Sequence, residues 1–317
     1  MRNILITGGA GFIGSHTAER LLKRGDRVVI LDVFNFSYDP IHKEHNIRLL
    51  EQYEQFKLYR GDIRDVELLD TIFKQENLDA VIHLAARAGV RPSLVEPSSY
   101  MDINITGTMR ILEAMREYDV TDMIFASSSS IYGSRLQGPF LETDPVDIPA
   151  SPYAATKKAG ELLCANWNHL YNHNINCLRF FTVYGPRQRP EMAIHLFASK
   201  IQNEECITMF GDGSSIRDYT YVDDIVDGIV CSLDLKKGYQ VINLGNSNPI
   251  RLDELIATIG RVVGKEPIVK QFPDQPGDVP MTFASVDRAK ELLNYEPKIS
   301  LEDGIRYFLD WKAKYVP

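Results

Sequence analysis

Three residues near the middle of the chain, Ser128, Tyr153 and Lys157, have the types and spacing needed to move a proton and a hydride. Ser151-Pro152 is typical of a helix start, so Tyr153 and Lys157 are expected four residues apart on one helical face. A tyrosine titrates near pH ~10, and a neighbouring ammonium group lowers that pKa toward the range of a useful base. We therefore expect Lys157 to lower the pKa of Tyr153.

The serine of this trio belongs to a run, because residues 127–130 are four consecutive serines with no acid among them. Elimination from a substrate needs a general acid close to the leaving group. The run therefore predicts oxidation and reduction without elimination. In an unrelated fold, the same residues would be no more than a polar loop at a strand end.

The amino terminus predicts a cofactor site for that chemistry. Residues 4–7 form an apolar run, a glycine-rich turn follows over 8–14, a helix is expected over 12–24, and a second apolar run leads to Asp32. Strand, glycine turn, helix, strand and acid, in this order, are typical of a dinucleotide site. The glycines let the backbone approach the pyrophosphate, and the helix start offers unpaired N–H groups to its charge.

Asp32 also separates two possible cofactors. Its carboxylate is expected to bind the adenosine ribose hydroxyls, and it would repel a 2′-phosphate, which needs an arginine beside it. Residues 33–37 contain no cation. We therefore expect NAD rather than NADP.

Strand and helix patterns alternate through the first half of the chain, which predicts an α/β fold with a doubly wound parallel sheet. Asp32, Ala85 and Ser128 then lie at the carboxyl ends of strands, where such sheets bind ligands. The expected strands are 3–7, 27–31, 56–60, 80–84, 122–127 and 175–180, and the expected helices are 12–24, 65–76, 100–118 and 152–172.

After residue 180 the pattern changes. Rigid loops are expected at 185–190 and 275–280, a helix at 191–203, a helix starting at Val222 and a strand at 241–244.

Composition fits a cytoplasmic globular enzyme. The 317 residues are 44% hydrophobic and carry a net charge of −8, which disfavours a general nucleic-acid or anionic-membrane surface. The four cysteines lie far apart, without metal-ligand spacing, so we expect free thiols and no metal. Residues 1–3 lead directly into the first strand, which leaves no room for a signal peptide, and no apolar run reaches the ~18 residues of a membrane span.

The spacing Gly8-x-x-Gly11-x-x-Gly14, with Tyr153 and Lys157, resembles the extended short-chain dehydrogenase/reductases over the whole chain. The resemblance implies a Rossmann domain at 1–180, to which 219–247 return, and a nucleotide-sugar lobe at 181–218 and 248–317. It implies cofactor contacts from Gly8, Gly11, Phe12, Ile13, Gly14, Asp32, Asp62, Ile63, Leu84, Ala85, Ala86, Asn104, Tyr153, Lys157 and Phe180.

The same resemblance implies a substrate site for a nucleoside-diphosphate sugar. Arg217 matches a position that contacts the diphosphate, and Asp278 one near the uridine ribose. The implied substrate residues are Arg91, Ser128, Ser129, Thr182, Arg189, Met192, Arg217 and Asp278.

Residues 128–130 decide which nucleotide-sugar reaction the resemblance implies. The 4,6-dehydratases of this superfamily carry Thr-Asp-Glu there, and UDP-glucuronate decarboxylases usually carry a glutamate at the place of Ser130. Both acids are absent here. The resemblance thus implies C4 oxidation and its reversal on tightly bound NAD, which is epimerisation.

Several segments resemble the UDP-glucuronate 4-epimerases, which convert UDP-glucuronate to UDP-galacturonate without decarboxylation. These segments are 32–40, 88–93, 126–130, 179–186, 189–193 and 275–280. Two features depart from that pattern: Arg87, where glutamine is expected, and the segment 211–215, which is more typical of general sugar epimerases.

Three alternatives stay open. The first is a UDP-glucose/UDP-galactose 4-epimerase, the second a true dehydrogenase or reductase, and the third a non-catalytic NAD-binding regulator. The presence of Ser128, Tyr153 and Lys157 argues against the regulator. The family usually dimerises through two helices, here near 100–118 and 152–172, so a homodimer is expected.

Overall fold

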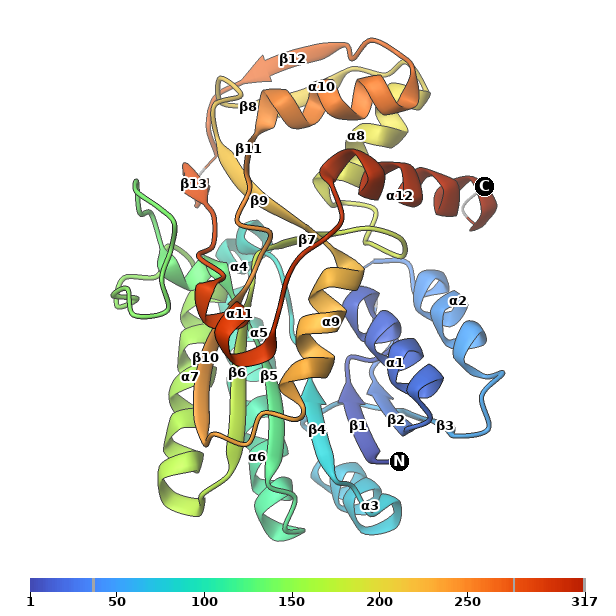
Figure 1. Cartoon of the computed structure of the whole chain (residues 1–317), viewed down its shortest axis with the longest axis vertical. Helices are drawn as coiled ribbons and strands as arrows, with labels where there is room; N and C mark the ends of the chain where they lie inside the picture. Colours follow the sequence, from blue (N-terminus) through green and yellow to red (C-terminus); the bar gives the residue numbers. More distant parts are fainter. Residues whose placement is uncertain (36–37, 276, 316–317) are drawn as a thin grey trace.

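The computed structural model describes residues 1–35, 38–275 and 277–315. The expected loops at 32–40 and 275–280 therefore lie partly outside the described residues, at Phe36, Ser37 and Pro276. A seven-stranded parallel sheet has the order β10-β6-β5-β4-β1-β2-β3 (Figure 1). Its strands are β1 (Asn3–Thr7), β2 (Arg27–Asp32), β3 (Phe56–Arg60), β4 (Ala80–His83), β5 (Asp122–Ser128), β6 (Asn174–Phe180) and β10 (Tyr239–Leu244).

The direction of winding changes between β1 and β4, which are adjacent in the sheet. Helices leaving the two strands go to opposite faces, so a crevice opens at their carboxyl ends, the place where doubly wound sheets bind ligands. All six strands expected before residue 181 are present within one residue at each end, which confirms the predicted α/β fold.

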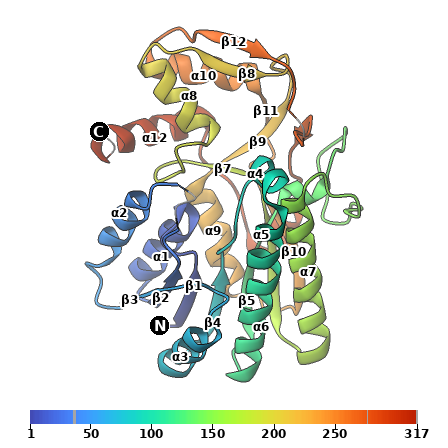
Figure 2. The ribbon, with the colours of Figure 1, turned by 180° about the vertical axis from the view of Figure 1, so that it is seen from behind.

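Helices cover both faces of the sheet (Figures 1 and 2). Alternate side chains along each strand point to opposite faces, so Ile4 and Ile6 pack in one buried cluster and Leu5 packs in the other. The first cluster involves α1 (Phe12–Arg24), α2 (Ile41–Leu50) and α9 (Val222–Ser232), and the second α3 (Val66–Glu76), α6 (Gly107–Glu117) and α7 (Pro152–Tyr171).

The helix expected at 100–118 is interrupted. It consists of α5 (Pro97–Met101), a π-helical turn (Asp102–Thr106) and α6. The π turn adds a residue to one turn of helix and lets Asn104 point inward, where its side chain is buried. Two short helical segments lie nearby: α4 (Val90–Val95) before α5, and a 3₁₀ turn (Ser129–Tyr132) after β5.

The lobe above the sheet in Figure 1 contains two small sheets and the helices α8 (Ala193–Gln202), α10 (Leu252–Val263) and α12 (Leu301–Tyr315). In one sheet β9 (Ile216–Tyr221) pairs with β7 (Thr182–Tyr184), β11 (Pro249–Arg251) and β13 (Met281–Thr282), and in the other β8 (Ile207–Phe210) pairs with β12 (Val269–Phe272). Helix α11 (Asp287–Leu293) lies outside this upper part and packs against β10 and α9 (Figure 1).

Contacts of different kinds join this lobe to the rest of the molecule, and two of them illustrate this. The buried carboxylate of Asp218 on β9 accepts hydrogen bonds from the backbone of Asn246 and Ser247, after β10, at 2.7 and 3.0 Å. The ring of Tyr315, at the end of α12, lies 5.1 Å from that of His45 on α2. No helix within the described residues is long and apolar enough to cross a membrane.

Candidate active site

A cavity of about 770 Å³ lies at the carboxyl ends of the sheet strands and extends under the lobe. It brings together residues that are far apart in the sequence, which is typical of a ligand site at this edge of a doubly wound sheet. Of the predicted site residues, it is lined by Gly8, Gly11, Phe12, Ile13, Gly14, Asp32, Asp62, Ile63, Leu84, Ala85, Ala86, Ser128, Tyr153, Lys157, Phe180, Thr182, Arg189 and Met192.

The glycine turn is shaped for close approach of another backbone or a ligand. Gly8 has φ +71°, and a Cβ there would lie 2.8 Å from the backbone of Ala85. A Cβ on Gly14 would lie 2.3 Å from the Gly8 carbonyl oxygen. Gly11 is the N-cap of α1 and has no side chain to satisfy the first N–H groups, which therefore remain available to an anion. This turn fits the pyrophosphate of a dinucleotide such as NAD.

Asp32 ends β2 at the edge of the cavity and is already hydrogen-bonded. One carboxylate oxygen accepts from the Ala10 backbone at 3.1 Å, and the other binds the Lys43 ammonium at 2.8 Å. Lys43 comes from α2, beyond the segment 33–37 in which the sequence shows no cation, so its contact with Asp32 was not predicted. Its charge is neutralised by Asp32, so the reason for expecting NAD rather than NADP still applies.

Asp62 lines the same end of the cavity and forms a two-pronged ion pair with Arg64, with contacts of 2.9 and 2.7 Å. This hydrogen-bonded guanidinium, despite an opposing effect of burial, lowers the pKa of Asp62 below its usual range. Asp62 is thus an acceptor that stays charged, beside the place predicted for adenine.

Ser128, Tyr153 and Lys157 meet in the cavity, as predicted. Ser151 caps α7 through a 3.2 Å hydrogen bond to the Ala154 backbone, which sets the helix start and the facing of Tyr153. Ser128 ends β5 and caps the 3₁₀ turn that follows by accepting from the Ser130 backbone at 3.2 Å.

The prediction that Lys157 lowers the pKa of Tyr153 is wrong for this structure. Burial raises the pKa of Tyr153, while a hydrogen bond with Ser128 and the charge of Arg189 oppose that effect. The Lys157 ammonium instead donates to the Ala126 carbonyl at 2.7 Å, and burial lowers its own pKa to about 8. The helical spacing is as expected, but desolvation dominates both groups.

A buried ion pair lies directly behind Ser128. Glu161, two helical turns after Tyr153, accepts from Arg179 on β6 through both oxygens, at 2.8 and 2.9 Å, and from Ser127 at 2.6 Å. Glu161 and Arg179 are about 1% and 2% exposed. The pair joins α7 to β5 and β6, and so fixes the strand end that carries Ser128.

Five predicted residues do not line the cavity. Asn104 uses its side chain to hold the Arg87 backbone, at 2.7 and 3.0 Å, and Thr156 at 2.9 Å, so it orients the cavity wall instead of facing the cavity. Ser129 is half-buried beside Ser128. The other three, Arg91, Arg217 and Asp278, lie together outside the cavity lining.

This outer group has its own geometry. Arg91 forms an ion pair with Asp278 at 2.7 Å and lies over the ring of Phe210, 4.9 Å from its centre. Arg217 is largely buried, and burial lowers the pKa of its guanidinium. The sequence reading did not include Phe210, whose place at the end of β8 was not recognised because that strand was not predicted.

The cavity is also lined by residues that were not predicted to bind a ligand. Arg87 hydrogen-bonds Ser99 at 2.5 Å and lies 5.3 Å from the ring of Tyr100, which meets the ring of Tyr153 edge-on at 6.2 Å. Glu191 lies 3.3 Å from Arg189. Arg87 had been noted only as a departure from the expected glutamine.

Comparisons with known proteins agree over the full length of the chain. The GDP-mannose 4,6 dehydratase family matches residues 5–308. The UDP-glucuronate 4-epimerase of Thermodesulfobacterium geofontis (strain OPF15) is 45% identical over 313 residues, which cover 98% of this chain and 96% of that protein.

Two solved structures are similar throughout. The UDP-glucuronic acid 4-epimerase from Bacillus cereus, in complex with UDP-glucuronic acid and NAD, gives a TM-score of 0.93 at 37% identity and covers 98% of this chain and 99% of its own. The UDP-glucose 4-epimerase from Thermotoga maritima, with UDP-glucose, gives a TM-score of 0.90 at 33% identity and covers 99% of this chain and 100% of its own.

Proposed function

This chain belongs to the GDP-mannose 4,6 dehydratase family, and we propose that it is an NAD-dependent UDP-glucuronate 4-epimerase that forms UDP-galacturonate. The serine run after β5 carries the proposal. Ser128 lines the cavity with Tyr153 and Lys157, while Ser129 and Ser130 occupy the places of the acids expected in dehydratases and decarboxylases. Similarity to an epimerase solved with UDP-glucuronic acid and NAD supports the substrate and the cofactor.

The reaction follows from the groups at the sugar end of the cavity. NAD, when bound, supplies a reversible acceptor for the hydride of the sugar C4. The Tyr153 oxygen takes the proton of the C4 hydroxyl and later returns it, and Ser128 donates a hydrogen bond to the same oxygen as it becomes a ketone. Lys157 lines the same cavity and would hold the nicotinamide ribose. The 4-keto sugar turns about its diphosphate linkage and presents its opposite face to these groups.

The enzyme must also prevent loss of carbon dioxide, because the 4-keto sugar is a β-keto acid. Decarboxylation needs the breaking C–C bond roughly perpendicular to the ketone plane. Thr182 and Arg189 line the cavity, where they offer a carboxylate a hydroxyl donor and a positive charge. We assign them to holding the carboxylate in a torsion that disfavours decarboxylation.

Replacing Thr182 with alanine is therefore expected to raise the share of turnovers that end in carbon dioxide and UDP-4-keto-pentose. The measurement is ¹³C NMR of the products formed from UDP-[6-¹³C]glucuronate. Thr71→Ala, which removes a threonine hydroxyl from the exposed face of α3, is the matched control. Equal release of carbon dioxide by Thr182→Ala and by the unchanged enzyme would refute this role.

A second candidate function is UDP-glucose 4-epimerisation, favoured by the similarity to the Thermotoga maritima enzyme. A panel of UDP-sugars followed by NMR separates the two functions. Turnover of UDP-glucose with no turnover of UDP-glucuronate would select the second.

The direct test of the proposed function is incubation of the purified protein with UDP-glucuronate and no added NAD. Formation of UDP-galacturonate is expected, because the cofactor is regenerated in each turnover and stays bound. A requirement for added NAD in stoichiometric amounts would instead indicate a true dehydrogenase.

The two-lobed organisation is part of this proposal. Residues 1–180 with 219–247 form the NAD-binding domain, since β10 and α9 both pack in the large sheet layer. Residues 181–218 and 248–317 form the nucleotide-sugar lobe. Arg217 and Asp278 of this lobe form a charged cluster with Arg91 of the NAD-binding domain, outside the main cavity. Binding of UDP alone, with and without Arg217→Gln, tests the assignment of this cluster.

The protein is further proposed to form a homodimer through α5–α6 and α7, which lie side by side in Figure 2. Leu162 and Leu170 of α7 are 59% and 53% exposed, and a dimer formed through this helix would bury them. Light scattering should give twice the 36.0 kDa chain mass, and Leu162→Glu should shift it to one chain mass. A single-chain mass for the unchanged protein would contradict the dimer.

A cytoplasmic location is also proposed. Cys164 and Cys177 interact in the buried core and are free thiols, which fits a reducing compartment. Fractionation of the producing cells against a cytoplasmic marker enzyme tests this location.

A further inference from the structure

We propose that Arg187 is a positioning residue, which fixes the loop 185–191 against the cofactor helix α1 and thereby sets the place of Arg189 at the sugar end. The inference rests on the proposed function, in which Arg189 holds the sugar carboxylate. It assigns to Arg187 the task of linking the two halves of the site.

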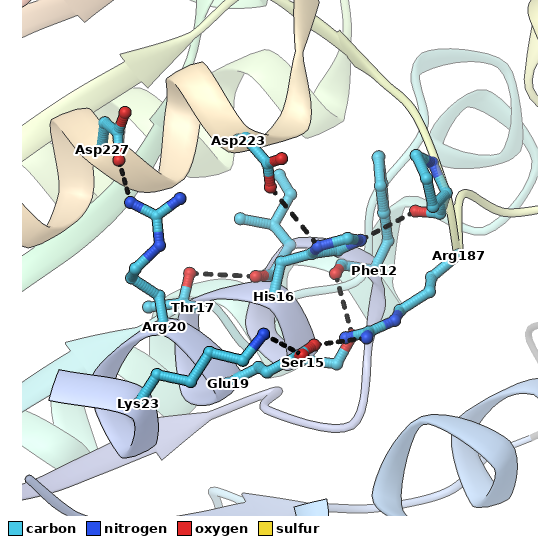
Figure 3. Close-up of polar contacts among 12 residues, drawn as sticks. Phe12, Ser15, His16, Thr17, Glu19, Arg20, Lys23, Arg187, Asp223 and Asp227 are labelled. Carbon is cyan, nitrogen blue, oxygen red and sulfur yellow. Dashed lines mark hydrogen bonds and ion pairs between the residues drawn. The ribbon is translucent and has the colours of Figure 1, made fainter. Parts of the chain in front are cut away.

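Arg187 is anchored on α1 by charge. Its guanidinium forms an ion pair with Glu19 and lies 3.5 Å from the Ser15 hydroxyl (Figure 3). The Arg187 side chain is only 9% exposed and that of Glu19 21%, so solvent screens this pair much less than a surface pair. Lys23 also binds Glu19, at 2.6 Å, and holds its carboxylate in place from the other side.

A second contact joins the same loop to the same helix. The His16 Nε2 lies 2.9 Å from the Pro186 carbonyl oxygen, and because a carbonyl can only accept, the proton must be on that nitrogen. His16 Nδ1 lies 3.8 Å from Asp223 at the start of α9 (Figure 3). Burial, followed by the charge of Arg187, lowers the pKa of His16 to about 3, so this contact is made by a neutral ring.

The loop transmits the position of Arg187 to Arg189 because it is tightly folded. Arg187 has φ +64°, a conformation that is uncommon for a residue other than glycine, and Gly185, two residues earlier, has φ +141°. The Gln188 backbone donates to the Gly185 carbonyl at 3.3 Å, and the buried Gln188 side chain accepts from the Gly185 backbone at 3.4 Å. One residue later, Arg189 lines the cavity.

The anchor and the cofactor turn belong to one helix. The glycine turn shaped for a pyrophosphate leads directly into α1, and Ser15, His16 and Glu19 lie on the first two turns of that helix. The face of α1 that holds the loop is thus fixed relative to the cofactor. The loop that carries Arg189 is therefore held to the same helix whose start would bind the cofactor pyrophosphate.

A double-mutant cycle tests the inference. Arg187→Gln is expected to raise the KM for UDP-glucuronate about 5- to 10-fold and to increase carbon dioxide release, with kcat for the epimerisation changed less than KM. Arg189→Gln should give larger changes of the same kind. In the Arg189→Gln background, Arg187→Gln should add less than a 2-fold further change, because it acts through Arg189.

Three further variants complete the experiment. Glu19→Gln should reproduce Arg187→Gln, and Arg187→Lys should restore part of the lost affinity. Arg20→Gln removes the ion pair with Asp227 at the same junction of α1 and α9 but does not touch the loop, so it should behave as the unchanged enzyme (Figure 3). Bound NAD and thermal stability are measured for every variant, to show that the fold is kept.

The outcomes separate the inference from the function on which it rests. Multiplying effects of Arg187→Gln and Arg189→Gln, or equal losses in Arg20→Gln and Arg187→Gln, would overturn the positioning role alone. No turnover of UDP-glucuronate by the unchanged enzyme would overturn the proposed function, and with it the premise of this inference.

Discussion

Tyr153→Phe is expected to lower kcat by about 10²- to 10⁴-fold, the range that a positioned general acid–base group contributes. The substitution removes only the hydroxyl, which lines the cavity and hydrogen-bonds with Ser128. The ring stays, together with its edge-on contact with Tyr100 at 6.2 Å. Bound NAD and stability should therefore be unchanged, and the KM for UDP-glucuronate should change little.

Tyr307→Phe is the matched control for this variant. Tyr307 lies on α12, is 48% exposed and is remote from the cavity lining, so its hydroxyl should be dispensable. Initial rates of UDP-galacturonate formation, with NAD content measured on the same samples, decide the outcome. If Tyr153→Phe kept more than a tenth of the activity, another group would have to be the base.

The largest effect on stability is expected from Glu161→Gln, which should lower the free energy of unfolding by about 3–5 kcal/mol. The amide is close in shape to the carboxylate but leaves the Arg179 guanidinium buried without a counter-charge. The Ser127 hydroxyl, which donates to Glu161 at 2.6 Å, loses its charged partner as well. The strand end that carries Ser128 should then loosen, and activity should fall along with stability.

Denaturant unfolding with an unchanged m-value measures this difference. Glu302→Gln removes one partner of an exposed i,i+4 ion pair with Arg306 on α12, and it should cost about 0–1 kcal/mol. If Glu161→Gln cost no more than Glu302→Gln, the buried pair would be dispensable for the fold.

The sheet and its first helices could be predicted because local signals agree there with burial. Gly11 and Gly25 mark both ends of α1, and the predicted range 12–24 is the observed one. The apolar strands are buried on both faces, so each reads as a short continuous run. In the lobe, α10 was not predicted, although Leu255, Ile256 and Ile259 show helical spacing. The expectations for that region rested on its loops and motifs and not on its periodicity.

Helix α2 could not be predicted from periodicity, and the reason is functional. Ile41 is 59% exposed, while Lys43 and Asn46 are buried, which reverses the usual pattern. Lys43 binds Asp32, and Asn46 donates to the Ala10 carbonyl at 2.9 Å, so the buried face of α2 is polar because it supports the cofactor turn. Local rules fail most often at such sites.

The candidate site was predictable in its residue types but not in its electrostatics. The spacing of Tyr153 and Lys157 placed both on one helical face, as observed. Sequence spacing contains no information about desolvation, which raises the pKa of Tyr153 and lowers that of Lys157. It also could not show that Arg187, in a loop more than 160 residues after α1, anchors on that helix.

The central claim is that C4 of the sugar is oxidised and reduced again within one site. No group is eliminated, and the C4 hydrogen does not exchange with solvent. The most direct test is turnover of UDP-[4-²H]glucuronate in ordinary water, followed by NMR of the product. The account predicts UDP-galacturonate that keeps its deuterium at C4 and takes up no solvent hydrogen at C5. Loss of deuterium from C4, or solvent hydrogen at C5, would contradict it.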